Sequence, residues 1–133
     1  MEEPFLKEEE HEEERNSRHK DMLKKEVLRK KCDFSALYKK GKKLKAGDVL
    51  VIYNKNNLDY ARRAFLASKK VGNSVERNRA RRIMKESMRL SGVSLKNGYD
   101  FVFIALKSIK GKKRTEIEKK LISSLKKREV VSQ

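Results

Sequence analysis

The sequence lacks the residues that disulfide scaffolds, zinc proteins and membrane proteins require. Cys32 is the single cysteine in 133 residues, which excludes an internal disulfide and leaves no cysteine cluster for zinc. No apolar run approaches the ~18 residues that span a bilayer, and the first residues lack the basic-then-apolar pattern of a secretion signal. We therefore expect a cytoplasmic protein.

Catalytic residues are scarce as well. A nuclease that acts alone needs clustered carboxylates to hold metal ions, or a pair of histidines for acid and base chemistry. His11 and His19 lie in a polar N-terminal segment without other metal ligands, and the acids beyond it are scattered over positions where caps and turns explain them. The sequence favours a protein that binds a partner over one that catalyses a reaction alone, and we expect no metal on the protein itself.

Positive charge is what the sequence has in excess. Lys and Arg number 36 against 19 Asp and Glu, which gives a formal net charge of +17. The distribution is uneven, because residues 1–14 carry eight Glu and one Lys, which leaves +24 on residues 15–133. A domain this basic is expected to bind nucleic acid or an anionic membrane surface.

The length of the chain allows one hydrophobic core. Residues 1–22 have too few apolar side chains to join it, so we predict a disordered or frayed acidic extension there. The folded domain is expected over residues 23–128, followed by a short tail over residues 129–133. An alternative interpretation gives the extension a function, in which it folds over the basic surface and weakens nonspecific RNA binding.

The apolar pattern predicts strands at 48–53, 60–71 and 99–106, with a short extra strand near Leu44. Helices are predicted at 34–40 with Asp33 as N-cap, after Asn73, and after a cap at Thr115. Because apolar residues occupy both faces of strand 48–53, we expect it to be covered on both sides. The order helix, strand, strand, helix, strand, helix predicts a compact α+β two-layer domain.

The stretch from Ser68 to Lys85 is predicted to contain a strand end, a tight turn at Gly72 and a basic helix. Asn73 is a good N-cap, and Glu76 three residues later completes a capping box. The stripe expected to pack on the domain consists of Glu76, Ala80, Ile83, Met84, Ser87 and Ser91. The remaining arc carries Arg77, Asn78, Arg79, Arg81, Arg82, Lys85 and Arg89. Like charges this dense repel each other, so we expect a polyanion to bind here; a solvated basic face is the alternative.

Phe34, Leu37 and Tyr38 recur at helical spacing and form one stripe on the first predicted helix. Two interpretations of this stripe stay open. It is core, or part of it faces a groove in which bases stack on the aromatic rings.

Ordered blocks of this sequence resemble the protein subunit of bacterial ribonuclease P. The first block is Ser68-Lys69-Lys70-Val71-Gly72-Asn73-Ser74-Val75-Glu76-Arg77-Asn78-Arg79-Ala80-Arg81-Arg82. The stretch from Asp33-Phe34 to Tyr38-Lys39-Lys40-Gly41-Lys42 resembles the first helix of that family, and Gly98-Tyr99-Asp100-Phe101-Val102-Phe103-Ile104-Ala105 its last strand. The resemblance runs from Leu28 to Lys127.

The resemblance implies a function. In that family an RNA subunit is the catalyst, and a small basic protein helps it to remove the 5′ leader of precursor tRNA with magnesium. The enzyme would be the ribonucleoprotein, a hydrolytic endonuclease, with Mg²⁺ held mainly by RNA and one protein monomer per RNA. By similarity, the RNA-subunit contacts would be Lys69, Lys70, Arg77, Asn78, Arg79, Arg81, Arg82 and Lys85. The leader would bind a cleft between the first helix and the sheet, lined by Phe34, Tyr38, Tyr53 and Ser68.

The resemblance also implies details of the fold. We expect a small, mostly antiparallel four-stranded sheet with about three helices and a left-handed βαβ crossover at the basic helix, against the usual right-handed rule. A structural rRNA-binding protein, such as a ribosomal component, is the alternative function that shares the size and the charge.

Overall fold

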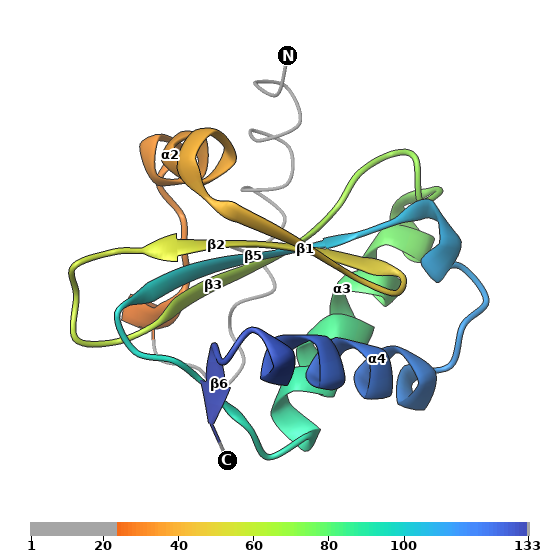
Figure 1. The fold of residues 1–133 in the computed structure, drawn as a ribbon. Helices are drawn as coiled ribbons and strands as arrows, with labels where there is room; N and C mark the ends of the chain where they lie inside the picture. Colours follow the sequence, from red (N-terminus) through yellow and green to blue (C-terminus); the bar gives the residue numbers. More distant parts are fainter. Residues whose placement is uncertain (1–23, 133) are drawn as a thin grey trace.

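A computed structural model describes residues 24–132, which form a four-stranded sheet with helices on both faces (Figure 1). The strands lie in the order β1-β2-β5-β3. Their bounds are Lys42–Ala46 for β1, Val49–Lys55 for β2, Arg62–Ala67 for β3 and Tyr99–Ala105 for β5. Two of the three pairings are antiparallel, and β3 runs parallel to β5. The predicted mostly antiparallel sheet is confirmed, including the short strand at Leu44.

Three α-helices lie within the described residues: α2 (Lys31–Lys40), α3 (Ser74–Leu90) and α4 (Arg114–Lys127). Two 3-10 turns, η1 (Lys24–Glu26) and η2 (Lys107–Ile109), precede α2 and α4. A small second sheet pairs β4 (Ser94–Leu95) with β6 (Val131–Ser132). No helix in this part of the chain is long and apolar enough to cross a membrane.

The helices cover both faces of the sheet, with α2 on one face and α3 and α4 on the other (Figure 1). The α2 side is packed by Leu28, Phe34, Leu37, Ile52, Ala64, Leu66 and Val102. The larger cluster on the other side includes Tyr53, Phe65, Met84, Phe101, Phe103 and Leu121. Phe101, Val102 and Phe103 follow one another along β5, point alternately to the two faces and are each 0% exposed, as expected of a strand covered on both sides. The α+β class is confirmed, but the layers number three, where the sequence predicts two.

Helix α3 links β3 to its parallel neighbour β5, so these elements form a βαβ crossover. This connection carries the basic helix across the sheet face opposite α2. The left-handed sense implied by the resemblance stays a prediction.

Two predicted helix caps are wrong. Helix α2 begins at Lys31, and Asp33 lies inside its first turn, where its carboxylate pairs with Arg62 at 3.2 Å. Helix α4 begins at Arg114, one residue before the predicted cap, and the Glu116 carboxylate accepts a hydrogen bond from the N–H of Lys113 at 3.0 Å. In α2 the first-turn carboxylate has a distant partner that the local pattern does not reveal, whereas in α4 it bonds to the backbone just before its own helix.

The predicted tail at 129–133 is part of the fold as far as the structure describes it. Val130 is buried with 3% of its surface exposed, and Val131 pairs with Leu95 between the two short strands. β-Branched residues favour such a strand pairing, but here they follow a run of Lys and Arg residues, so the sequence analysis did not identify a strand. The predicted extension at 1–22 lies outside the described residues.

Candidate nucleic-acid interface

The start of α3 is held by reciprocal hydrogen bonds. The Asn73 side chain accepts from the N–H of Glu76 at 2.9 Å, and the Glu76 carboxylate accepts from the N–H of Asn73 at 2.9 Å. Lys110 also pairs with Glu76 at 3.2 Å. The backbone hydrogen bond from Asn73, then the contact with Lys110, lowers the pKa of the Glu76 carboxyl below its ordinary value. The predicted capping box is confirmed. The contact of Lys110 with Glu76 also ties the start of α3 to the segment after β5.

Gly72 is required at this turn for two reasons. Its φ of +151° is a conformation that side chains rarely adopt. A Cβ at this position would lie 1.9 Å from Oε1 of Glu76, which is closer than two atoms can approach. Any larger residue here would displace the carboxylate that caps the helix.

Helix α3 buries a wider stripe than the sequence predicts. Its buried residues are Arg77, Ala80, Arg81, Ile83, Met84, Ser87 and Met88. Glu76 and Ser91, predicted on this stripe, are only partly buried. The outward position predicted for Arg77 and Arg81 is wrong, since they are 8% and 1% exposed.

The long stems of Arg77 and Arg81 flank the apolar stripe and can be buried with it. Their guanidiniums bond to their own helix: Arg77 Nη2 donates to Ser74 Oγ at 3.3 Å, and Arg81 Nη2 donates to Asn78 Oδ1. Both side chains therefore brace the turn that presents the exposed residues.

The exposed side of α3 and the turn before it keep most of the predicted basic residues. Lys69, Lys70, Asn78, Arg79, Arg82 and Arg89 are exposed and Lys85 is half-buried; these seven residues are called the α3 basic face below. Arg79 Nη2 donates to the Lys112 carbonyl at 3.1 Å. Within residues 24–132, no carboxylate pairs with Arg79 or Arg82. Guanidiniums without an anionic partner are well suited to bind phosphate.

The predicted aromatic cleft is only partly assembled. Phe34 is 1% exposed and belongs to the packing under α2, while Tyr38 is half-buried beside it. Placing Tyr53 with them is wrong, because it lies on the opposite face of the sheet, where its hydroxyl accepts from Arg128 Nη1 at 2.9 Å. Side chains alternate along a strand, so Ile52 takes the α2 side. Ser68, half-buried just after β3, accepts from the N–H of Lys70 at 3.3 Å.

Sequence reasoning missed two sheet residues that, like Tyr38, pack partly buried on the α2-side cluster. Leu50 and Ile104 pack only partly buried on the α2-side cluster, and they are direct cross-strand partners. Leu50 is also paired with Lys45, which is exposed on the edge strand β1. Lys45, Leu50, Ile104 and Tyr38 are called the α2-side row below. Side chains alternate along strand 48–53, and this period of two could have placed Leu50 and Ile52 together on the face that α2 covers.

An ion network fixes α2 above this face. Arg62 binds Asp100 at 2.7 Å and Asp33 at 3.2 Å, and Asn56 donates to Asp100 at 2.8 Å. The hydrogen bond with Asp100 raises the pKa of Arg62, against the effect of burial. The sequence assigned these acids to caps and turns; the structure assigns them to the joint between α2 and the sheet.

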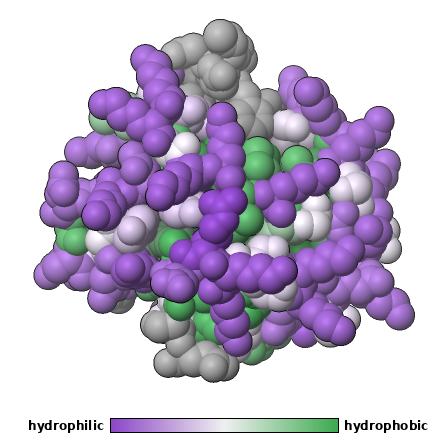
Figure 2. Space-filling view, viewed as in Figure 1, coloured by the Kyte–Doolittle hydropathy of each residue, from purple (hydrophilic) through white to green (hydrophobic). Residues whose placement is uncertain are grey.

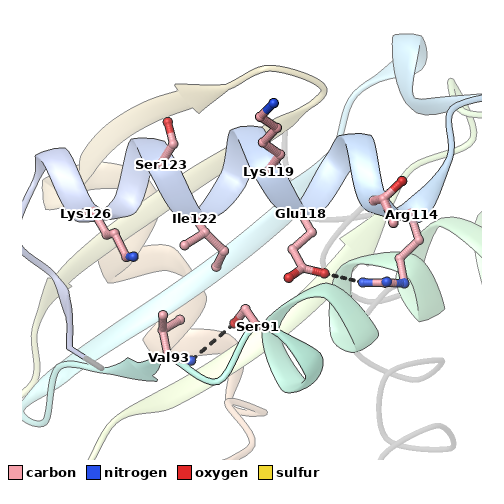
Figure 3. A pocket seen from close by; sticks show the side chains of 9 residues that line it. Ser91, Val93, Arg114, Glu118, Lys119, Ile122, Ser123 and Lys126 are labelled. Carbon is pink, nitrogen blue, oxygen red and sulfur yellow. Dashed lines mark hydrogen bonds and ion pairs between the residues drawn. The ribbon is translucent and has the colours of Figure 1, made fainter.

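A groove of about 500 Å³ lies elsewhere, between the C-terminal end of α3 and α4 (Figure 3). Ile122 and Val93 point into it, and the ion pair of Arg114 with Glu118 closes one end. None of the predicted site residues lines it. Hydrophilic side chains cover most of the protein face in Figure 2, with small hydrophobic areas between them.

The described residues contain no group of three His, Cys, Asp or Glu side chains that could hold a metal ion.

Comparison with known proteins shows the family of the chain. The sequence model of the ribonuclease P family matches residues 22–129. The ribonuclease P protein component of Alkaliphilus metalliredigens is 44% identical over 106 residues, covering 79% of this chain and 95% of that protein. The Staphylococcus aureus RNase P protein aligns with a TM-score of 0.70 and 29% identity, over 79% of this chain and 96% of that one. The Thermotoga maritima RNase P protein gives 0.67 and 30%, over 77% and 96%. The chain belongs to the ribonuclease P protein family.

Proposed function

We propose that this chain, the protein component of an enzyme that matures tRNA 5′ ends, binds the catalytic RNA through the α3 basic face. The observation that carries the proposal is the pair of exposed guanidiniums, Arg79 and Arg82, that no described carboxylate neutralises. They sit on a helix whose start is locked by the Asn73–Glu76 capping box. A rigid helix with outward guanidiniums can bind phosphates without first ordering its own backbone.

The energetic basis is counterion release. Each phosphate that a Lys or Arg neutralises adds roughly 0.7–0.9 to the slope of log affinity against log salt concentration. Neutralising phosphates also lets two RNAs approach each other at lower magnesium. In this proposal magnesium stays with the RNA, and one protein monomer serves one RNA.

The single-stranded 5′ leader of precursor tRNA is proposed to lie on the α2-side row. Tyr38, Leu50 and Ile104 offer partly exposed apolar area there, and Lys45 adds positive charge at the strand edge. Base stacking on such a surface tolerates any base and is worth ~1–3 kcal/mol per base. Contact with the leader would distinguish precursor from mature tRNA without reading its sequence.

The buried residues of the predicted site take supporting roles in this proposal. Phe34 holds α2 on the sheet beneath the row, and Arg77 and Arg81 brace the first turns of α3. Tyr53 has no part in the leader surface. Ser68 lies where β3 ends and the turn to the α3 basic face begins, and so joins the two proposed surfaces.

The double variant Arg82→Ala, Lys85→Ala tests the RNA-binding proposal. We expect weaker binding to the catalytic RNA and a loss of holoenzyme activity that is largest at low magnesium. The matched control is Lys126→Ala, Lys127→Ala, which removes two charges at the far end of α4 (Figure 1). Equal losses in both variants, or a magnesium dependence unchanged by the first, would contradict the proposal. A protein that binds ribosomal RNA fragments as tightly as the catalytic RNA would favour the structural alternative.

A further inference from the structure

We infer that the acidic segment 1–14 binds the α3 basic face of its own chain and competes there with RNA that is not the cognate partner. The inference rests on the proposed function of this face. It assigns a partner to the face in the free protein, and it gives a role to residues that precede the family match at 22–129.

Charge complementarity is the first argument. The segment carries eight Glu and one Lys, a net charge of −7, while the rest of the chain carries +24. On the α3 basic face, Arg79 and Arg82 have no carboxylate partner within the described residues. The one acid at the start of the helix, Glu76, is already engaged by Asn73 and Lys110. The acidic segment is the densest run of negative charge in the sequence.

Reach is the second argument. Residues 15–24 connect the segment to the first described residue, and ten extended residues span up to about 33 Å. Helix α3 has 17 residues and is therefore about 25 Å long. Val27, three residues after Lys24, bridges to Arg63 of β3, and β3 contacts α3, so the connection starts beside the strand that leads into this helix. A connection of this length permits contact within one chain.

Tethering decides the size of the effect. The inference treats residues 15–24 as a linker, and short flexible linkers give a local concentration of about 1 mM. If the segment binds with a dissociation constant of about 0.1 mM at low salt, it reduces the affinity of a competing RNA about tenfold. Both contacts are electrostatic, so the competition fades as salt rises. The competition lowers the affinity of every RNA that needs the α3 basic face by the same factor, so an RNA that binds this face alone is lost first, while a cognate RNA with further contacts still binds.

The first test compares the full chain with a variant in which Gln replaces the glutamates of the segment at unchanged length. The substituted positions are Glu2, Glu3, Glu8, Glu9, Glu10, Glu12, Glu13 and Glu14. A second variant permutes residues 2–14 without changing their composition. Affinity is measured for a 30-base-pair RNA duplex, a single-stranded poly(U) and the catalytic RNA, over a range of KCl concentrations.

We expect the Gln variant to bind the duplex and poly(U) about tenfold more tightly at low salt, with a gain of at most the same size for the catalytic RNA, which binds tightly even in the natural chain. The difference should vanish at high salt, and the permuted variant should match the natural chain. Affinities for duplex and poly(U) within twofold of the natural chain at every salt concentration would overturn the inference. These readouts need no cleavage, so they decide the inference even if the catalytic RNA is not the partner.

A spin label tests the contact directly. The label is attached through Glu8→Cys in a Cys32→Ser background, and the backbone amide signals of α3 are recorded by NMR. At low salt we expect broadening around Arg79 and Arg82, lost on adding salt or RNA. Broadening confined to other elements would overturn the inference. So would broadening of α3 that arises only between a labelled chain and a separate isotope-enriched chain, because the contact would then be intermolecular.

Discussion

The Arg62 guanidinium binds the Asp100 carboxylate through two nitrogens, Nε at 2.8 Å from Oδ1 and Nη2 at 2.7 Å from Oδ2. Its third nitrogen, Nη1, reaches Asp33 of α2 at 3.2 Å. One residue of β3 thereby joins its parallel neighbour β5 to the helix above the sheet. The position of α2 over the α2-side row, and with it the shape of the proposed leader surface, depends on this joint.

Replacing Arg62 by Met should lower the free energy of unfolding by about 2–4 kcal/mol, because Asp100 would keep its charge in a largely buried position where, among residues 24–132, Asn56 is its remaining side-chain hydrogen-bond donor. Urea denaturation measures the change. Arg62→Lys is the matched control, since it keeps the charge but loses the two-nitrogen geometry, and it should fall between the natural chain and Arg62→Met. A loss below about 0.5 kcal/mol for Arg62→Met would show that the network contributes little.

Gly72→Ala should destabilise the protein more than Gly111→Ala. Both glycines have positive φ, +151° and +80°, so both variants strain the backbone. Only at Gly72 would the new Cβ collide with another group, the Glu76 carboxylate; nothing lies within 4 Å of a Cβ at Gly111. The additional loss of the cap is worth about 1 kcal/mol. Thermal unfolding of the two variants measures the difference, and equal losses would mean that the Glu76 side chain adapts without cost.

Stability should fall in acid partly because of Asp48. Burial opposes ionisation of this carboxyl, but hydrogen bonds from Ser108 and Lys112 and the charges of Lys112 and Lys120 outweigh it and lower its pKa. A carboxyl whose pKa is lower in the folded state stabilises the protein above its unfolded pKa of about 4, and this contribution is lost as pH falls through the folded value.

Asp48→Asn should therefore cost about 1–3 kcal/mol at neutral pH and progressively less below about pH 4. Denaturation of both proteins between about pH 2.5 and about pH 7 measures how their free energies of unfolding converge in acid. If the free energies of unfolding of the two proteins changed in parallel with pH, Asp48 would not contribute to the acid sensitivity.

Tyr38→Ala should reduce the preference for precursor over mature tRNA, by up to about 1–3 kcal/mol if one base stacks there. Tyr53→Phe should leave that preference unchanged, because the ring of Tyr53 packs on the α3 and α4 side and the variant removes only a hydroxyl bound by Arg128. The ratio of dissociation constants for the two tRNAs is the readout. An effect of Tyr53→Phe equal to that of Tyr38→Ala would contradict the assignment of faces.

Patterns along the chain predicted what depends on neighbours in sequence. The capping box needs only Asn73 and Glu76, and the strands at 48–53 and 99–106 are apolar enough to be located from sequence. The resemblance added the family and the βαβ crossover. Long-range partners were not visible: Asp33 looks like a cap until Arg62 is placed beside it, 29 residues away.

The sequence analysis assigned three side chains to the wrong face of their helix or strand. Arg77 and Arg81 are charged, so an exposed position was predicted, yet they flank the apolar stripe and are buried along it. The resemblance placed Tyr53 in the cleft, although strand alternation puts its neighbour Ile52 on the α2 side. For this residue the period of the strand predicts the face better than the resemblance does.

The decisive experiment is cleavage of a 5′-extended precursor tRNA at low magnesium, by a bacterial ribonuclease P RNA with and without this protein. We expect strong stimulation by the natural chain, a clear loss with Arg82→Ala, Lys85→Ala, and no such loss with Lys126→Ala, Lys127→Ala. An RNA that cleaves equally well with and without the protein, at magnesium concentrations where it is impaired alone, would contradict it.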